Sequence, residues 1–268
     1  MPNKTVNQRV AEGCGQGTGT NYQPAIWIAD FSSTGTSTQS LGWKTNRLHH
    51  CLSGLEFRYF YILEWSPIVV DIREQFPLDL SSTQDIAADC GFKHPANTNT
   101  KDPNQMTTDF LITIKGKIGE INQARTIKPA DQLENSRVLE KLEIERRYWA
   151  ERSISWGIVT EHEIPNILSE NIEWLHNSYY PQDLAPLTER DVRHIATELT
   201  KGIVTSVNSL KDIAGECDDR LGLEPGSSLL VARHLIATRS WLVDLNYPLS
   251  SQFRTTLKLL STPSTEKN

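Results

Sequence analysis

The strongest constraint on the fold is a stretch from residue 131 to residue 152 that contains neither glycine nor proline. It is rich in leucine, glutamate and arginine, which have high helix propensity, so it predicts a long helix. Val138, Leu142, Glu145 and Trp149 recur at helical spacing and form one stripe along it. Such a stripe faces the core of a domain.

Short apolar segments on both sides of this helix predict the strands of a sheet. Residues 68–76 are interpreted as one strand, which Pro77 ends, and residues 110–114 as a second. Residues 118–127 then return antiparallel after a glycine-containing turn, which makes a hairpin. A further strand is expected over residues 154–160.

Helical patterns lie between and beyond these strands. Residues 52–65 predict a helix that Ser53 can cap, with Glu56 three residues later. A short helical piece is expected over residues 84–88, and another helix begins at Pro165. The chain therefore predicts an α/β (α+β) fold with a restriction-endonuclease-like mixed sheet flanked by helices, formed by residues 1–178.

Residues 179–268 predict a second, mainly helical domain after a linker that contains Pro181 and Pro186. Three helices and then a short apolar, strand-like segment suit a small helix-turn-helix or winged-helix-like module. The expected segments are helices over 191–199, 210–221 and 228–240, and the strand-like piece over 241–245.

The first 48 residues are rich in glycine, threonine, serine and asparagine. The glycine run at residues 13–19 has no strand before it and no helix after it, so it is not a dinucleotide-binding loop. We interpret it as part of a mobile arm. A phosphate-contacting arm is the alternative, because glycine lets the backbone approach a ligand closely.

Charge and cysteine content exclude several function classes. The formal net charge is −6, whereas autonomous DNA binding is usually accompanied by a basic surplus. A nuclease with this charge is expected to need partners that hold it on DNA. The four cysteines include no CxxC pair, which argues for free thiols rather than a zinc site or a disulfide framework. No apolar run of membrane-spanning length and no signal-peptide pattern occurs, so a soluble, cytoplasmic protein is expected.

Three chemically competent side chains are expected at the ends of elements. Asp109 begins one strand of the hairpin and Lys128 ends the other, so the two should meet at one edge of the sheet, with Glu56 on the preceding helix. This is the arrangement of a restriction-endonuclease type of site, where carboxylates hold Mg²⁺ and a lysine positions or deprotonates water or neutralises phosphate. An exposed Asp109–Lys128 ion pair without a catalytic role is the alternative.

Glu145 stands in the apolar stripe of the long helix. A buried carboxylate is costly unless it is paired or ligates a metal. The pattern leaves two alternatives open, an internal ion pair with an arginine or a supporting role beside Lys128 or the metal.

A series of short blocks over about residues 10–178 resembles the TnsA family, the endonuclease subunits of heteromeric bacterial transposases. The blocks follow one another in order and with nearly the family spacing. They are Leu48-His49-His50, Leu55-Glu56, Leu63-Glu64-Trp65, residues 70–78, Lys93-His94-Pro95, residues 106–110, Lys128-Pro129-Ala130, residues 139–149 and residues 171–175.

The resemblance implies a role for each matched residue. Glu56 and Asp109 would bind Mg²⁺, or Mn²⁺ as a substitute, Lys128 would be the catalytic lysine, and Glu145 would be a further glutamate near the site. Two residues before the lysine stands Thr126, where many restriction-type nucleases have a carboxylate. The Thr126 hydroxyl and the Ile127 carbonyl are therefore the expected additional metal ligands.

The resemblance also implies an activity and its partners. The family hydrolyses phosphodiester bonds at the 5′ ends of the transposon. A DDE-type TnsB-like partner acts at the 3′ ends, and an ATP-dependent TnsC-like regulator contacts the C-terminal part. A catalytically silent subunit that docks or bridges DNA is the alternative, and so is a stand-alone nuclease, against which the acidic charge argues. For Arg233 and Arg239 of the second domain, we weigh a phosphate-facing recognition helix against a packing helix in a partner-docking module.

Overall fold

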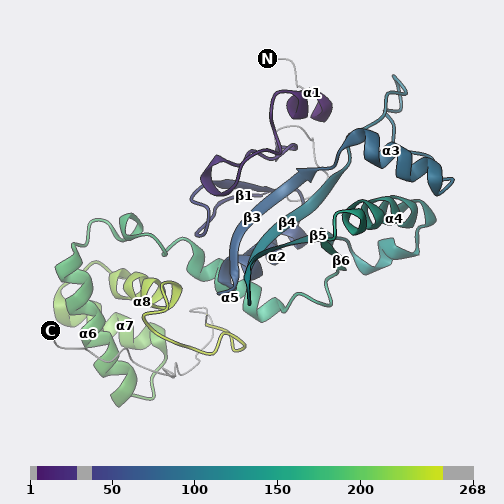
Figure 1. The fold of residues 1–268 in the computed structure, drawn as a ribbon. Coiled ribbons are helices and arrows are strands. Elements are labelled where there is room, and N and C mark those ends of the chain that lie inside the picture. Colours follow the sequence, from purple (N-terminus) through teal and green to yellow (C-terminus); the bar gives the residue numbers. More distant parts are fainter. Residues whose placement is uncertain (1–4, 29–37, 250–268) are drawn as a thin grey trace. The chain divides into compact units, whose positions relative to one another are not determined.

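The computed structural model describes residues 5–28 and 38–249 and divides the chain into two compact units (Figure 1). The first unit ends at Ile164 and the second begins at Pro165. The structure thus places the boundary earlier than the predicted one at residue 178. The reason is that helix α5 (Asn166–His176) belongs to the second unit, where Asn171 donates hydrogen bonds of 2.8 Å to the carbonyls of Leu245 and Tyr247.

A four-stranded mixed sheet organises the first unit. Strand β3 (Val69–Pro77) pairs antiparallel with β4 (Thr107–Gly116), which pairs antiparallel with β5 (Gly119–Ile127). Strand β6 (Ser155–Val159) then adds in parallel to β5, so the order is β3-β4-β5-β6. The structure confirms the predicted mixed sheet and its hairpin, although β4 is longer at both ends than its apolar part indicated.

Helices cover both faces of this sheet. Phe110 and Leu111 are neighbours on β4 and therefore point to opposite faces. The ring of Phe110 lies 5.7 Å from that of Tyr59 in α2 (Gly54–Trp65), whereas Leu111 joins the core formed with Ile144 and Trp149 of α4 (Ser136–Glu151). Helix α2 and helix α4 therefore lie on opposite sides of the sheet. Helix α3 (Leu80–Asp89), which packs on the α4 side, is longer than the predicted piece.

The predicted continuous helix over residues 131–152 is interrupted. A 3-10 turn, η3 (Ala130–Glu134), precedes α4, and Asn135 between them has an extended backbone. The Asn135 side chain accepts hydrogen bonds from the backbone N–H groups of Arg137 and Val138, and so caps α4. Asparagine competes with helix hydrogen bonds in this way, which a propensity argument alone does not register.

The glycine run near the N-terminus packs against β3. Gly19 donates its N–H to the Asp71 carboxylate (3.2 Å), and a Cβ on Gly15 would lie 2.2 Å from the Pro77 ring. The expected mobile arm is therefore wrong for this stretch, which lies between α1 (Val6–Ala11) and η1 (Gly19–Asn21). Residues 1–4 and 29–37 of that expected arm lie outside the described residues.

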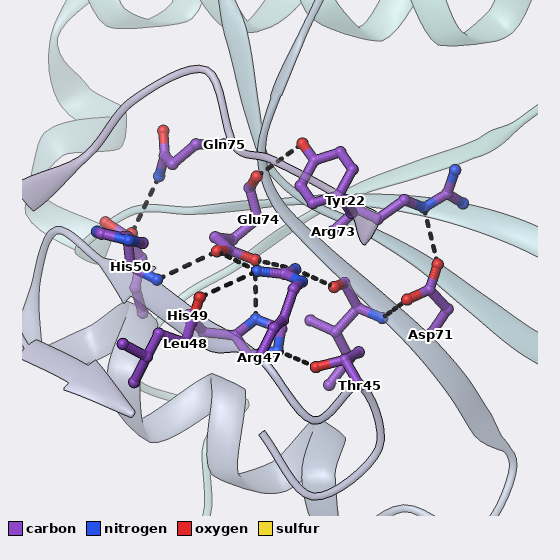
Figure 2. A network of polar contacts seen from close by, with 12 residues as sticks. Tyr22, Thr45, Arg47, Leu48, His49, His50, Asp71, Arg73, Glu74 and Gln75 are labelled. Atoms are coloured by element: carbon purple, nitrogen blue, oxygen red, sulfur yellow. Dashed lines mark hydrogen bonds and ion pairs between the residues drawn. The ribbon is translucent and has the colours of Figure 1, made fainter. Parts of the chain in front are cut away.

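A buried polar network joins a small two-stranded sheet, β1 (Thr38–Leu41) and β2 (Leu48–Cys51), to β3 (Figure 2). Glu74 is fully buried and accepts hydrogen bonds from Arg47 (2.8 and 2.5 Å) and from His49 Nδ1 (2.8 Å). Burial alone would raise the pKa of Glu74, but His49 and Arg47 hold it well below its usual range. Tyr22 closes the network by donating to the Glu74 carbonyl (2.9 Å).

The second unit is helical, as predicted. It contains α5, the 3-10 turn η4 (Pro181–Leu184), α6 (Glu189–Thr205), α7 (Leu210–Leu221) and α8 (Ser227–Ala237). The expected strand-like piece at residues 241–245 contains only an isolated bridge at Leu242. Arg233 stacks 5.0 Å from the Trp174 ring and donates to the Trp174 carbonyl, which favours the packing-helix alternative at that position.

Two expectations about the whole chain can also be compared with the structure. The cysteines are free thiols, as predicted, and Cys14, Cys51 and Cys217 are buried. None of the helices in residues 5–28 and 38–249 has the length and apolar character needed to cross a bilayer.

The Glu74 network makes a testable stability prediction. Glu74→Gln should lower the free energy of unfolding by about 3–5 kcal/mol, because it leaves the buried Arg47 guanidinium without its counter-charge. Urea unfolding followed by tryptophan fluorescence measures the change. Glu143→Gln removes a partly exposed carboxylate paired with Arg146 and Arg147, and should cost no more than about 1 kcal/mol. Equal losses in the two variants would contradict the structural role of the network.

Candidate active site

Glu56 lies in the first turn of α2, buried at the start of the helix. As predicted, Ser53 caps this helix by accepting from the Glu56 N–H (3.1 Å). The carboxylate in turn accepts from the Ser53 hydroxyl (2.9 Å), the Leu52 N–H (3.0 Å) and the Gln75 amide (3.2 Å). Three donors from two elements therefore fix the direction of this carboxylate.

Asp109 on β4 and Lys128 at the end of β5 meet as the hairpin geometry predicts. Asp109 Oδ2 accepts from Lys128 Nζ (3.0 Å) and from the Ile127 N–H (2.7 Å). Lys128 Nζ also donates to the Ile127 carbonyl (2.9 Å). The Asp109 and Lys128 side chains are only 12% and 28% exposed, so the alternative of a solvent-exposed ion pair is wrong.

Glu145 projects from α4 into a pocket of neutral donors. Its Oε1 accepts hydrogen bonds from the hydroxyls of Thr108 (2.6 Å) and Thr126. The indoles of Trp149 and Trp156 donate to these same hydroxyls at 2.7 and 3.2 Å. No arginine pairs with Glu145 in the described part of the chain, so the ion-pair alternative is wrong. The Thr126 hydroxyl already serves Glu145, which disfavours its expected role as a metal ligand.

Electrostatic interactions link Lys128 to the three carboxylates of Glu56, Asp109 and Glu145. Burial and the nearby Asp109 raise the pKa of Glu56 to about 7. Burial and Asp109 also raise the pKa of Glu145 to about 7. Burial alone would lower the pKa of Lys128, but Asp109, Glu145 and Glu56 raise it instead. Three carboxylates thus act on one lysine, and one positive charge does not neutralise them.

The donor set fits a hard divalent cation. Glu56, Asp109 and the Ile127 carbonyl offer oxygen atoms only, the ligands that Mg²⁺ prefers. Across residues 5–28 and 38–249, no three His, Cys, Asp or Glu side chains gather closely enough to hold a metal ion. Glu145 therefore stands apart from a two-carboxylate site, and an ion there would keep positions for water or phosphate, as Mg²⁺ commonly does. Burial is the main cause of the raised pKa values of Glu56 and Glu145, and the negative charge of Asp109 adds to both shifts.

Gln75 is a site residue that the sequence argument missed. It is buried and donates to Glu56, while its Oε1 accepts from the Thr107 hydroxyl (3.3 Å). Its backbone is left-handed, with φ of 48°, where non-glycine residues are strained. The pairing of its neighbours Glu74 and Phe76 with Phe110 and Thr108 places it opposite Asp109. The predicted strand also contains Asp71, Arg73 and Glu74, so the sequence pattern does not single out Gln75.

The raised pKa of Glu145 predicts an unusual pH dependence of stability. Because its pKa in the folded state lies near 7 and its unfolded value near 4.5, the folded protein takes up a proton in this window and becomes less stable as pH rises through it. The variant Glu145→Gln lacks this titration. Its free energy of unfolding minus that of the wild type should therefore increase by about 2–3 kcal/mol from pH 5 to pH 8, measured by urea unfolding with EDTA present.

Glu143→Gln provides the control on the same helix. The pKa of Glu143 is lowered to about 2 by its hydrogen bonds to Arg146 and Arg147, so this group does not titrate in the same window. Its substitution should leave the pH dependence between pH 5 and 8 unchanged. If the difference in unfolding free energy between Glu145→Gln and the wild type were also constant from pH 5 to pH 8, Glu145 would ionise as a solvent-exposed carboxylate does.

Comparison with known proteins identifies the family. One family model, described as TnsA-like endonuclease N terminal, matches residues 66–161, which include Asp109, Lys128 and Glu145 but begin after Glu56. A second, described as TnsA endonuclease C terminal, matches residues 163–245. The transposition protein TnsA of transposon Tn7 from Escherichia coli is 41% identical over 235 residues, which cover 87% of this chain and 82% of the relative. The chain therefore belongs to the TnsA endonuclease family.

Proposed function

We propose that this chain is the Mg²⁺-dependent endonuclease subunit of a heteromeric transposase, and that it hydrolyses phosphodiester bonds at the 5′ ends of a transposon. The observation that carries the proposal is the 3.0 Å ion pair between Asp109 and Lys128 at the β4–β5 hairpin, together with the buried Glu56 carboxylate of α2, which interacts electrostatically with both. Membership of the TnsA endonuclease family and the similarity to the Tn7 transposition protein support it.

The proposed ligands are the Glu56 and Asp109 carboxylates and the Ile127 carbonyl, with Mg²⁺ as the natural ion and Mn²⁺ as a substitute. When bound, the ion supplies Lewis-acid activation of the scissile phosphate. The Ile127 N–H and the Lys128 ammonium both hold Asp109 Oδ2, so the ligand is oriented before the ion arrives.

Lys128 acts as a cation in this proposal. Its raised pKa keeps it protonated at neutral pH, so it stabilises negative charge on the phosphate rather than removing a proton from water. Glu145 and Gln75 are positioning residues. Glu145 is held by Thr108 and Thr126 behind the β4–β5 pair, and Gln75 orients Glu56.

A catalytically silent, DNA-docking subunit is the second candidate. Thr126 favours it, because the hydroxyl is committed to Glu145 and adds no charge to the cation site. The oriented Glu56 and Asp109 carboxylates favour the nuclease, because an inactive subunit has no need to keep them together beside Lys128.

The proposed setting of the activity follows from the family. The subunit acts in the cytoplasm on transposon-end DNA, with a DDE-type TnsB-like partner that processes the 3′ ends. An ATP-dependent TnsC-like regulator docks on the helical unit that begins at Pro165. The net charge of −6 agrees with a subunit that others hold on DNA.

Substitution of Asp109 tests the nuclease proposal. Asp109→Asn should reduce 5′-strand cleavage by about 10³-fold or more, ~4 kcal/mol of transition-state stabilisation, because a cation ligand is lost. Strand-specific cleavage of end-bearing DNA, with and without the partner proteins, measures it. Asp85→Asn on the exposed face of α3 is the matched control and should cleave normally. Full cleavage by Asp109→Asn would refute the site, and equal Mn²⁺ affinity in wild type and variant would favour the silent subunit.

Substitution of Gln75 tests its positioning role. Gln75→Ala should weaken Mn²⁺ binding by about 10-fold or more, because Glu56 loses a donor that fixes its direction. Isothermal titration calorimetry measures the affinity independently of cleavage. Gln84→Ala on the exposed side of α3 removes the same side chain without touching Glu56. Unchanged Mn²⁺ affinity in a folded Gln75→Ala protein would show that Gln75 has only a structural part.

A further inference from the structure

A basic groove lies between the segment that follows α3 and the N-terminal half of α4, away from the carboxylates of the site. Its volume is about 400 Å³. Four cationic side chains line it, and none of its lining residues is acidic. The groove is lined by Lys93, His94, Pro95, Ala96, Asn97, Thr98, Lys101, Asn104, Arg137 and Lys141.

Most of these cations lack an anionic partner. Over residues 5–28 and 38–249, no salt bridge involves Lys93, Lys101 or Lys141, and only Arg137 pairs with a carboxylate, that of Glu140. Elsewhere on α4, Arg146 and Arg147 share Glu143. Holding three uncompensated ammonium groups around one concavity on a protein of net charge −6 creates a local positive potential that favours a polyanion.

The groove is preformed by local hydrogen bonds. Asn97 accepts from the N–H groups of Asn99 (2.8 Å) and Thr100 (3.1 Å), and Asn104 donates its N–H to the Pro95 carbonyl (2.9 Å). Arg137 donates to the Lys93 carbonyl, which ties the segment to α4. A ligand would therefore meet lysines that are already grouped, and little backbone ordering would oppose binding.

Helix α4 connects the groove to the site. Arg137, Lys141 and Glu145 are spaced by four residues each, so they follow one ridge of the helix. At about 1.5 Å per residue, Lys141 lies ~6 Å and Arg137 ~12 Å from Glu145 along the axis. Each strand of a DNA duplex carries one charge per ~3.4 Å of axis, so this span corresponds to a few nucleotides. The positive end of the helix dipole lies on the groove side.

We propose that this groove binds the sugar-phosphate backbone of DNA a few nucleotides from the bond that is cut. The lysines act as sequence-independent phosphate contacts, and Asn97, Thr98 and Asn104 add neutral polar groups at the rim. The position relative to the cut rests on the proposed function, whereas binding of the backbone does not.

Paired lysine substitutions test the groove. The protein is titrated against a fluorescein-labelled DNA duplex in EDTA, where cleavage is absent, and anisotropy is read over a range of salt from about 25 mM upward. Lys93→Ala with Lys141→Ala should raise the Kd about 10-fold or more and reduce the slope of log K against log salt by about 2. Lys115→Ala with Lys117→Ala removes the same charge from the exposed β4–β5 turn and should change the Kd less than about 2-fold.

Three outcomes would overturn the groove as a DNA site. The first is that the wild type does not bind the duplex at the lowest salt, and the second is that both lysine double variants lose the same DNA affinity. The third is that the protein binds a polyglutamate peptide in preference to DNA. Thermal unfolding of each pair establishes that the fold is intact. The result also separates the two proposals. If the Lys93/Lys141 double variant loses DNA affinity and the wild type does not cleave, only the nuclease proposal is refuted. If the double variant keeps normal DNA affinity and the wild type cleaves, only the groove proposal is refuted.

Discussion

The burial of three carboxylates, those of Glu56, Asp109 and Glu145, with a single cation, Lys128, acting on them is the constraint on which the candidate site depends. Burial raises the pKa values of Glu56 and Glu145 to about 7, and the nearby Asp109 adds to both shifts, because one ammonium group does not neutralise three carboxylates. Such an arrangement costs stability in the isolated protein. It persists because the surrounding sheet and helices determine the positions of the side chains, and a divalent cation held by Glu56 and Asp109 would relieve the repulsion.

The hydrogen-bond donors to Glu56 and Glu145 carry no charge, so they do not neutralise these carboxylates. Glu145 accepts from threonine hydroxyls, and Glu56 accepts from a serine, a backbone N–H and the Gln75 amide, all of which are neutral. Glu74, one residue away from Gln75, is treated differently. Arg47 supplies its counter-charge and His49 a hydrogen bond, and its pKa is held well below the usual range. Two adjacent residues of β3 thus have different roles. Glu74 stabilises the fold, and Gln75 orients the Glu56 carboxylate of the candidate site.

Charge distribution reconciles an acidic chain with an anionic substrate. The overall charge of −6 disfavours strong autonomous binding to DNA, and yet cations gather in one groove beside α4. A localised contact of this kind supplies orientation near the cut without strong attraction elsewhere on the surface. Under the proposed function, partner proteins would supply the rest of the affinity for DNA.

The sequence by itself determined several of the elements and the local placement of the candidate site residues. The hairpin of β4 and β5 could be read from apolar runs around a glycine turn, and its antiparallel geometry places Asp109 beside Lys128. The Ser53 cap fixed the start of α2 and so the location of Glu56, and the stripe on α4 identified Glu145 as a buried carboxylate. These features are local, because they depend on residues close together in the chain or on strand pairing across a short turn.

Only the tertiary structure decided what surrounds those residues. That threonines rather than an arginine satisfy Glu145, that Gln75 reaches Glu56, and that the glycine run packs on β3 all depend on contacts between residues distant in sequence. The groove likewise requires Lys93 and Lys141 to be brought together by the segment folding onto α4. Periodicity and propensity describe which side of an element is buried, but the partner it meets there is selected by packing across the whole unit.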